Sequence, residues 1–253
     1  TDKTVDIAYS FTRDVIITNK GFFNQCKAAY DIANYKYLIS IESDHIYPSN
    51  FCQNFLSAFL KSSFDGMQGT LICSEKNNYF ERGLDLFYKI HQKEKGYKEI
   101  ISGPNIFKTQ SRKEIHKKLT IQGYSIDTEM AEAIKARGYK VGLSNIKAFQ
   151  STNLDYKNFK RKYFNYGKGD YEFYNQHKKN WSLKRKLKSM THIFNRYIID
   201  YPLKAIKMGK VLYVPYFWLS AFVRYAGWVY AIIWKKIMWS PWWIWESNIP
   251  DNI

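Results

Sequence analysis

Residues 37–45 read Tyr-Leu-Ile-Ser-Ile-Glu-Ser-Asp-His, and this stretch decides the fold that the sequence predicts. It begins as a short run of aromatic and β-branched residues, which is typical of a buried strand. It ends in Glu42 and Asp44, which point to the same side of an extended segment because side chains alternate with a period of two. Ligands of open α/β sheets bind at the carboxyl ends of strands. The pair therefore favours a divalent cation, Mg²⁺ or Mn²⁺, bound with a phosphate; the alternative is an acidic turn leading to Pro48.

The composition indicates an anionic partner. The 253 residues suffice for one good-sized domain and an appendage. With 39 Lys and Arg against 22 Asp and Glu, the formal charge of +17 suits nucleic acid, a membrane surface or a phosphorylated substrate. Aromatic residues make up 18%, which is high for a nucleic-acid-binding tail, and no RNA-binding signature is present. The three cysteines lack metal-site spacing, so we expect reduced thiols: Cys26, Cys52 and Cys73.

Helical and strand patterns alternate on both sides of the opening stretch. A short strand at 14–18, a helix at 21–33 and the strand at 37–41 would form a βαβ unit of a parallel sheet. The remaining predicted helices lie at 48–60, 79–95, 111–119 and 128–137, and the remaining strands at 67–73, on both sides of a turn within 99–107, and at 139–143.

Asp127 stands where the last of these helices begins. It is a candidate site residue, and the alternative is an N-cap of that helix. Glu129 follows two residues later, so on a helix the two carboxylates point in different directions. We expect only one of them to face a site.

The carboxyl-terminal third changes in composition and predicts membrane contact. Residues 157–196 hold twelve Lys and Arg against two acidic residues, and all eight tryptophans follow position 180. Residues 211–233 are mostly apolar, and a helix of this length would measure roughly 34 Å, enough to cross a bilayer core. Arg224 interrupts this run, so a hairpin or an interfacial helix is the alternative to a span, and a soluble buried helix is the third reading.

Tryptophans follow this run in a cluster typical of membrane–water interfaces: Trp239, Trp242, Trp243 and Trp245. The sequence thus predicts three parts. Residues 1–155 would form the catalytic domain, residues 156–205 a basic interfacial helical segment, and residues 206–253 a hydrophobic membrane-associated segment with a Trp-rich tail.

Four segments, in this order and spacing, resemble motifs of the inverting family 2 glycosyltransferases of the GT-A fold. Residues 1–4 resemble the segment after the family's first strand, and residues 37–44 with Pro48 resemble the strand ending in Asp-x-Asp. Residues 102–108 resemble the acceptor-side Gly-x-x-x-Phe-(Arg/Lys) motif, and residues 127–141 the Glu-Asp motif with its helix and Gly-Tyr-x-Val strand. The resemblance covers roughly residues 1–170. It implies a Rossmann-like mixed sheet with flanking helices, amino-terminally incomplete because the family's first strand would precede Thr1.

The resemblance also implies roles for individual residues. Asp127 would be the catalytic base, Asp44 the metal ligand, and Glu42 and Lys27 donor-binding residues, Glu42 on the ribose or sugar side and Lys27 at the phosphates. The acceptor side would hold Gly103, Asn105 and Glu129. Three positions depart from the family pattern. Glu42 replaces the usual Asp, and Ile126 replaces the Glu before the base. Gln150 lies in the region where many members have a His, so the third metal ligand is open between His45 and Gln150.

The implied function is a membrane-associated enzyme with a cytoplasmic catalytic part and a Mg²⁺ or Mn²⁺ cofactor. It would move a hexose from a nucleotide-diphosphate sugar to a glycan or lipid-linked acceptor with inversion. Residues 123–129 are similar to polyprenyl-phosphate sugar synthases, whereas residues 160–169 are similar to enzymes that elongate surface glycans. The alternatives from other classes are a catalytically inactive scaffold and a basic membrane- or nucleic-acid-binding protein.

Overall fold

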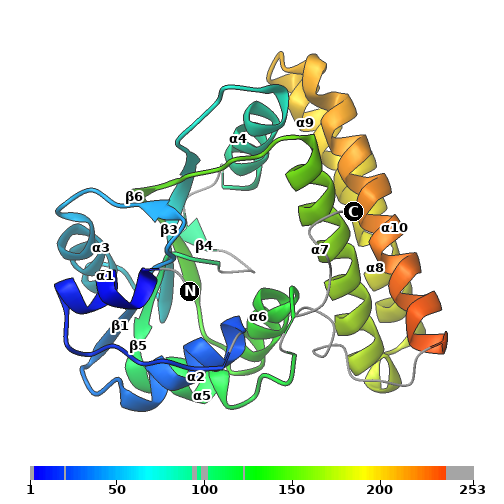
Figure 1. Cartoon of the computed structure of the whole chain (residues 1–253). Coiled ribbons are helices and arrows are strands. Elements are labelled where there is room, and N and C mark those ends of the chain that lie inside the picture. Colours follow the sequence, from blue (N-terminus) through cyan, green and yellow to red (C-terminus); the bar gives the residue numbers. More distant parts are fainter. Residues whose placement is uncertain (1–2, 20, 93–95, 98–101, 122, 238–253) are drawn as a thin grey trace. The chain divides into compact units, whose positions relative to one another are not determined.

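The computed structural model describes residues 3–19, 21–92, 96–97, 102–121 and 123–237 (Figure 1). The chain forms two compact units. The first contains residues 1–74 and 92–151, and the second contains residues 75–91 and 152–253. This division differs from the predicted domains, because residues 75–91 join the carboxyl-terminal unit. The two predicted carboxyl-terminal segments also form one unit instead of two.

The first unit is an α/β structure around a mixed sheet, which confirms the predicted α/β class. Its strands are β1 (Tyr37–Ser40), β2 (His45–Ile46), β3 (Gly66–Cys73), β4 (Gly96–Tyr97), β5 (Asn105–Lys108) and β6 (Val141–Gln150). Its helices are α1 (Thr4–Phe11), α2 (Phe22–Ile32), α3 (Phe51–Leu60), α5 (Thr109–His116) and α6 (Ile126–Ala136).

The sheet brings three strand ends to one edge. The strand order is β1-β5-β3-β6-β2, with β4 paired to β6. β1 and β3 both run antiparallel to β5, so they share a direction, and β3 is parallel to β6. The carboxyl ends of β1, β3 and β6 therefore lie at the same edge, where ligands of α/β sheets bind.

The predicted βαβ unit at the amino terminus is wrong. Residues 14–18 form no strand, and β1 pairs antiparallel with β5 instead of parallel with a preceding strand. The run Val15-Ile16-Ile17 has the composition of a strand, but none of its side chains is buried. Strand propensity depends on packing against neighbours, and these residues have none to pair with in the described sheet.

Most other predicted elements are confirmed with shifted ends. The predicted face of α3 is confirmed, because Phe51, Phe55 and Phe59 are all buried. Ser111 does not begin a helix, since α5 starts two residues earlier at Thr109. Gly138 ends the helix before β6 with a positive φ of 68°, a conformation that costs glycine little. The predicted strand before Pro104 falls at residues 99–101, outside the described residues.

The second unit is helical. It contains α4 (Tyr79–His91), α7 (Tyr156–His177), a short 3-10 helix η1 (Lys178–Asn180), α8 (Leu183–Ile193), a π-helix η2 (Phe194–Asp200), α9 (Tyr201–Lys207), the 3-10 helix η3 (Val211–Tyr213) and α10 (Val214–Ile237). Its core is aromatic: Phe159, Tyr163, Tyr197, Tyr201, Tyr216 and Phe217 are buried.

The apolar run at 211–233 lies largely within α10, the orange helix in Figure 1. No helix among the described residues is both long enough and apolar enough to cross a membrane. Arg224, midway along α10, is largely buried and bonds to Asp170 of α7, with 2.8 Å between Nη2 and Oδ1. The Trp-rich tail falls in residues 238–253, outside the described residues.

Candidate functional site

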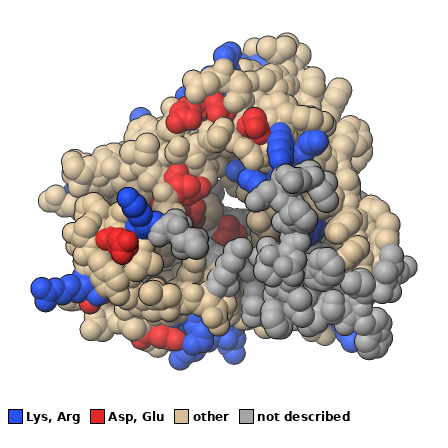
Figure 2. Space-filling model, viewed as in Figure 1, with Lys and Arg blue, Asp and Glu red and all other residues tan. Residues whose placement is uncertain are grey.

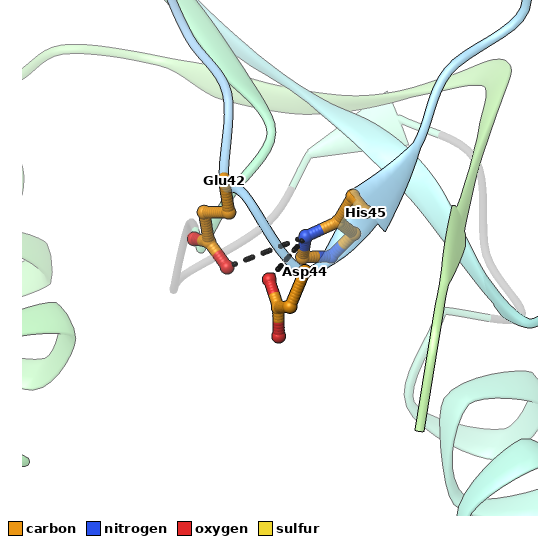
Figure 3. A group of neighbouring side chains, drawn as sticks. All are labelled: Glu42, Asp44 and His45. Atoms are coloured by element: carbon orange, nitrogen blue, oxygen red, sulfur yellow. Dashed lines mark ion pairs between the residues drawn. The ribbon is translucent and has the colours of Figure 1, made fainter. Parts of the chain in front are cut away.

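Three side chains at the carboxyl end of β1 form a compact cluster (Figure 3). Glu42 and Asp44 lie in the turn after β1, and His45 begins β2. The His45 Nδ1 atom lies 2.8 Å from Asp44 Oδ1 and 3.6 Å from Glu42 Oε2. Figure 3 shows the imidazole nitrogen directed toward both carboxylates. One ligand atom from each residue lies within 4.8 Å of the other two, so the three could converge on one small cation.

Asp44 is held ionised by its neighbours. The His45 imidazole and the Gln150 amide lower the pKa of Asp44 to about 2, although burial acts in the opposite direction. The Gln150 amide, at the carboxyl end of β6, donates to Asp44 Oδ2 over 2.9 Å. The pairing of His45 with Gln150 across β2 and β6 brings these side chains together.

The His45 side chain is buried, but its ring nitrogens lack hydrogen bonds of good geometry among the described residues. The side chain is 1% exposed. Neither ring nitrogen makes a hydrogen bond of good geometry within the described part of the chain, so Nδ1 has only its ion-pair contacts. Buried polar atoms are normally paired, so such a nitrogen facing two carboxylates suits a ligand. The donor set of one imidazole and two carboxylates fits a divalent metal ion.

Asp127 has a strongly perturbed carboxyl group. Burial, then the negative charge of Glu42, raise the pKa of Asp127 to about 7, and Arg112 acts in the opposite direction. The N-cap interpretation of Asp127 is wrong, because Ser125 precedes the helix and Asp127 lies within its first turn. Because the charge of Glu42 acts on Asp127, this candidate base lies in the neighbourhood of the acidic cluster.

Arg112 is a site residue that sequence reasoning missed. It lies on α5, is 4% exposed, and donates from Nε and Nη2 to the Tyr30 hydroxyl over 3.0 and 2.7 Å. Its guanidinium also lies 5.4 Å from the centre of the Phe107 ring. The sequence gives no signal for it, since it is one cation in a basic helix and only tertiary packing shows it buried.

Cys26 belongs to the same electrostatic neighbourhood. Burial raises the pKa of this thiol, and the charges of Arg112, Asp127 and Glu42 all act on it. Residues from α2, α5 and α6 and from the turn after β1 thus share one region, although they are far apart in sequence.

Gly103 lies beside Glu42, and Asn105 lies opposite Ser40 in the sheet. A Cβ atom on Gly103 would collide with the Glu42 carboxylate, so only glycine leaves room for that side chain. Asn105 pairs with Ser40 of β1 and Gln68 of β3 in the sheet. Its side chain is buried, and its Oδ1 has no hydrogen-bond partner among the described residues. Of the predicted acceptor-side residues, Gly103 therefore borders the cluster, and Asn105 lies in the strand beside β1.

Glu129 and Lys27 have different surroundings. Glu129 accepts hydrogen bonds from the backbone of Thr120 and Ile121 and from the Thr120 hydroxyl, so its carboxylate holds the loop before α6. Lys27 is exposed and forms an ion pair of 2.7 Å with Asp31, one turn along α2. The prediction that Asp127 and Glu129 face different surroundings is confirmed.

A scan against known protein families finds no match for this chain. A search of curated proteins likewise finds no matching sequence.

Proposed function

We propose that this chain is a metal-assisted glycosyltransferase. It moves a hexose from a nucleotide-diphosphate sugar to a glycan or lipid-linked acceptor with inversion, and its first unit is of the GT-A type. One observation carries the proposal. A carboxyl group with a pKa near 7, Asp127, interacts electrostatically with an acidic cluster that can hold a divalent cation. Perturbed carboxyl groups beside candidate metal ligands are typical of catalytic sites.

The acidic cluster would hold the cation and, through it, the donor. Asp44 is ionised well below neutral pH. The His45 imidazole and the Glu42 carboxylate complete a set of three ligands. When bound, Mg²⁺ or Mn²⁺ would offset the negative charge that develops on the departing nucleoside diphosphate. This arrangement gives Glu42 a metal-binding role in addition to the sugar-side contact that the resemblance implies.

Asp127 would take the proton from the attacking hydroxyl of the acceptor. A general base works best when its pKa lies near the working pH, and burial beside Glu42 brings Asp127 there. A single displacement assisted by one base inverts the anomeric centre. Arg112 would keep part of the Asp127 population ionised, since its guanidinium lowers the pKa of that carboxyl group.

The acceptor would approach past Gly103 and Asn105. Gly103 packs closely against the Glu42 carboxylate, and the Asn105 Oδ1 atom, which has no hydrogen-bond partner among the described residues, can accept a hydrogen bond from a sugar hydroxyl. The proposal gives no catalytic role to Lys27 or Glu129. Lys27 forms an exposed ion pair with Asp31, and Glu129 holds the loop before α6. The proposal keeps the catalytic part at the cytoplasmic face of a membrane.

One rival is a basic membrane- or nucleic-acid-binding protein. Lys and Arg side chains on the face shown in Figure 2 form small separate groups among acidic and uncharged ones. Nucleic-acid-binding domains instead gather their cations in a stripe or patch. The visible part of this face shows no such stripe or patch.

Calorimetric titration of UDP and GDP, each with and without Mn²⁺, tests the proposal. We expect metal-dependent binding that Asp44→Ala abolishes. The matched control is Asp14→Ala, which removes an exposed carboxylate of the same unit that has no described contact. Asp127→Asn should keep nucleotide binding and lose roughly 10²- to 10⁴-fold in transfer rate. Absence of nucleotide binding by the folded full-length protein would refute the enzyme and favour the scaffold.

A further inference from the structure

The helix that begins at Leu183 leaves an apolar stripe in solvent. On α8 and at the start of η2, large apolar side chains recur at intervals of four, three and four residues: Leu183, Leu187, Met190 and Phe194. They are between 39% and 72% exposed. This spacing places them on one face of a helix. A contiguous exposed apolar face of this kind marks an interaction site.

The π-helix keeps the stripe in line. After Phe194 the next exposed apolar residue is Ile199, five positions on, and the interval of five matches the wider turn of a π-helix. Leu203 and Ile206 of α9 then continue the stripe at the α-helical intervals of four and three, and they are 51% and 50% exposed. The wide turn thus inserts one residue, and the apolar stripe stays on the same side of the helix.

The opposite face of the same helix is already occupied. Ile193, Tyr197, Tyr201 and Ala205 follow one another at intervals of four, and each is at most 4% exposed. They pack into the aromatic core of the second unit. The outer stripe is therefore not the core-facing side of this helix.

A second stripe runs along the neighbouring helix α10. Trp218, Phe222, Val229 and Ile233 are between 45% and 67% exposed. The two helices lie side by side. The Trp218 indole donates to the Ile198 carbonyl over 3.3 Å, and the Tyr225 hydroxyl accepts from the Phe194 backbone amide and donates to the Met190 carbonyl, each over 3.1 Å. We call the two stripes together the apolar face.

The charge around the apolar face is almost all positive. Residues 183–233 contain nine Lys and Arg and a single acidic residue, Asp200. Five of the lysines are exposed: Lys184, Lys188, Lys204, Lys207 and Lys210. An apolar face with lysines beside it matches an interfacial helix on an anionic bilayer. A second copy of the chain would instead bring like charges together.

We propose that the apolar face rests on the surface of an anionic lipid bilayer, with its stripes among the acyl chains and its lysines at the headgroups. This inference deepens the membrane association in the proposed function by naming the surface that meets the bilayer, and it does not rest on the catalytic part of that proposal. No residue of the apolar face belongs to the acidic cluster, so lipid binding and nucleotide binding can fail separately.

Sedimentation with lipid vesicles tests this inference on the full-length chain. Vesicles of phosphatidylcholine are compared with vesicles that also contain about one third phosphatidylglycerol. We expect binding to the anionic vesicles only, weakened at least about tenfold by Leu187→Asp combined with Leu203→Asp, because the variant loses apolar contact and gains negative charge. The matched control, Leu60→Asp, places the same change on an equally exposed leucine of α3 in the other unit and should leave binding unchanged.

Circular dichroism and thermal unfolding establish that the double variant is folded. Equal vesicle binding by the double variant and the unaltered protein would overturn the inference. So would binding that disappears with Trp242→Ser and Trp243→Ser alone, since those residues are not among the ones that define the apolar face. Self-association that the double variant abolishes, without any vesicle binding, would identify a second copy as the occupant.

Discussion

At the scale of single residues, the two aspartates of the site have opposite electrostatic settings. The His45 imidazole and the Gln150 amide favour the ionised form of Asp44, whose pKa is about 2. Burial and the charge of Glu42 favour the protonated form of Asp127, whose pKa is about 7. The two carboxyl groups are therefore suited to different tasks, one to holding a cation and the other to exchanging a proton near neutral pH.

This difference predicts how stability depends on pH. The folded-state pKa of Asp127, about 7, exceeds its usual value of 3.8, so the folded protein holds this proton more tightly. The resulting stabilisation is complete below the unfolded-state pKa and is lost as the pH rises through about 7. We expect Asp127→Asn to remove this fall in the free energy of unfolding, measured by urea titration between about pH 4 and about pH 8 with a chelator present.

Asp44→Asn is the control with the opposite sign. The folded-state pKa of Asp44, about 2, is lower than its usual value of 3.8, so its contribution is present above the unfolded-state pKa and lost as the pH falls through about 2. With the titration extended down to about pH 2, this variant should remove the fall on the acid side, and between about pH 4 and about pH 8 it should lower the free energy of unfolding evenly without changing its slope. If the free energy of unfolding of Asp127→Asn still fell between about pH 4 and about pH 7, the raised pKa of Asp127 would be contradicted.

At the scale of elements, α7 and α10 approach at two glycines. A Cβ atom on Gly167 of α7 would collide with the Arg224 carbonyl of α10. A Cβ atom on Gly227 of α10 would collide with the Phe164 carbonyl of α7. The contact is reciprocal and between backbones, so no side-chain rotation can relieve it. Such close approaches also allow weak Cα–H···O contacts between the helices.

Gly167→Ala should therefore destabilise the protein. Helix propensity alone favours alanine by about 1 kcal/mol, whereas forcing a methyl group against a backbone typically costs about 1–3 kcal/mol. We expect a net loss in the free energy of unfolding, measured by chemical denaturation. Ala226→Ser, at an exposed position of α10, is the control and should stay within about 0.5 kcal/mol. A stabilised Gly167→Ala variant would show that the helices do not approach this closely.

At the scale of the whole molecule, the two units have separate cores and separate buried charges. The second unit holds the Asp170–Arg224 pair, to which the Tyr197 hydroxyl adds an acceptor 3.2 Å from Arg224 Nη1. Burial raises the pKa of Asp170, but the Arg224 guanidinium and the His192 imidazole together outweigh burial, and the pKa lies below its ordinary value. The pair lies outside the proposed catalytic cluster.

Breaking this pair should affect stability and leave the site intact. Asp170→Asn leaves the Arg224 charge largely buried without its counterion, which typically costs about 3–5 kcal/mol. Asp170→Leu with Arg224→Met should recover much of that loss, because no isolated charge remains. Denaturant unfolding measures both, and UDP or GDP affinity of the folded fraction should not change. A lowered nucleotide affinity would show that the two units are coupled.

The sequence by itself determined the α/β class of the first unit, the strand that precedes Glu42 and Asp44, and most helices. Periodic apolar patterns and helix-ending glycines act locally, so the sequence alone shows them. It did not determine that residues 14–18 pair with no strand, that β1 lies antiparallel beside β5, or that residues 75–91 join the second unit. Only the tertiary structure decided which polar groups are buried together: Arg112 against Tyr30, His45 facing two carboxylates, and Asp127 within the field of Glu42. The physical reason is that burial and charge interactions depend on distances in space, and these join residues that the sequence separates widely.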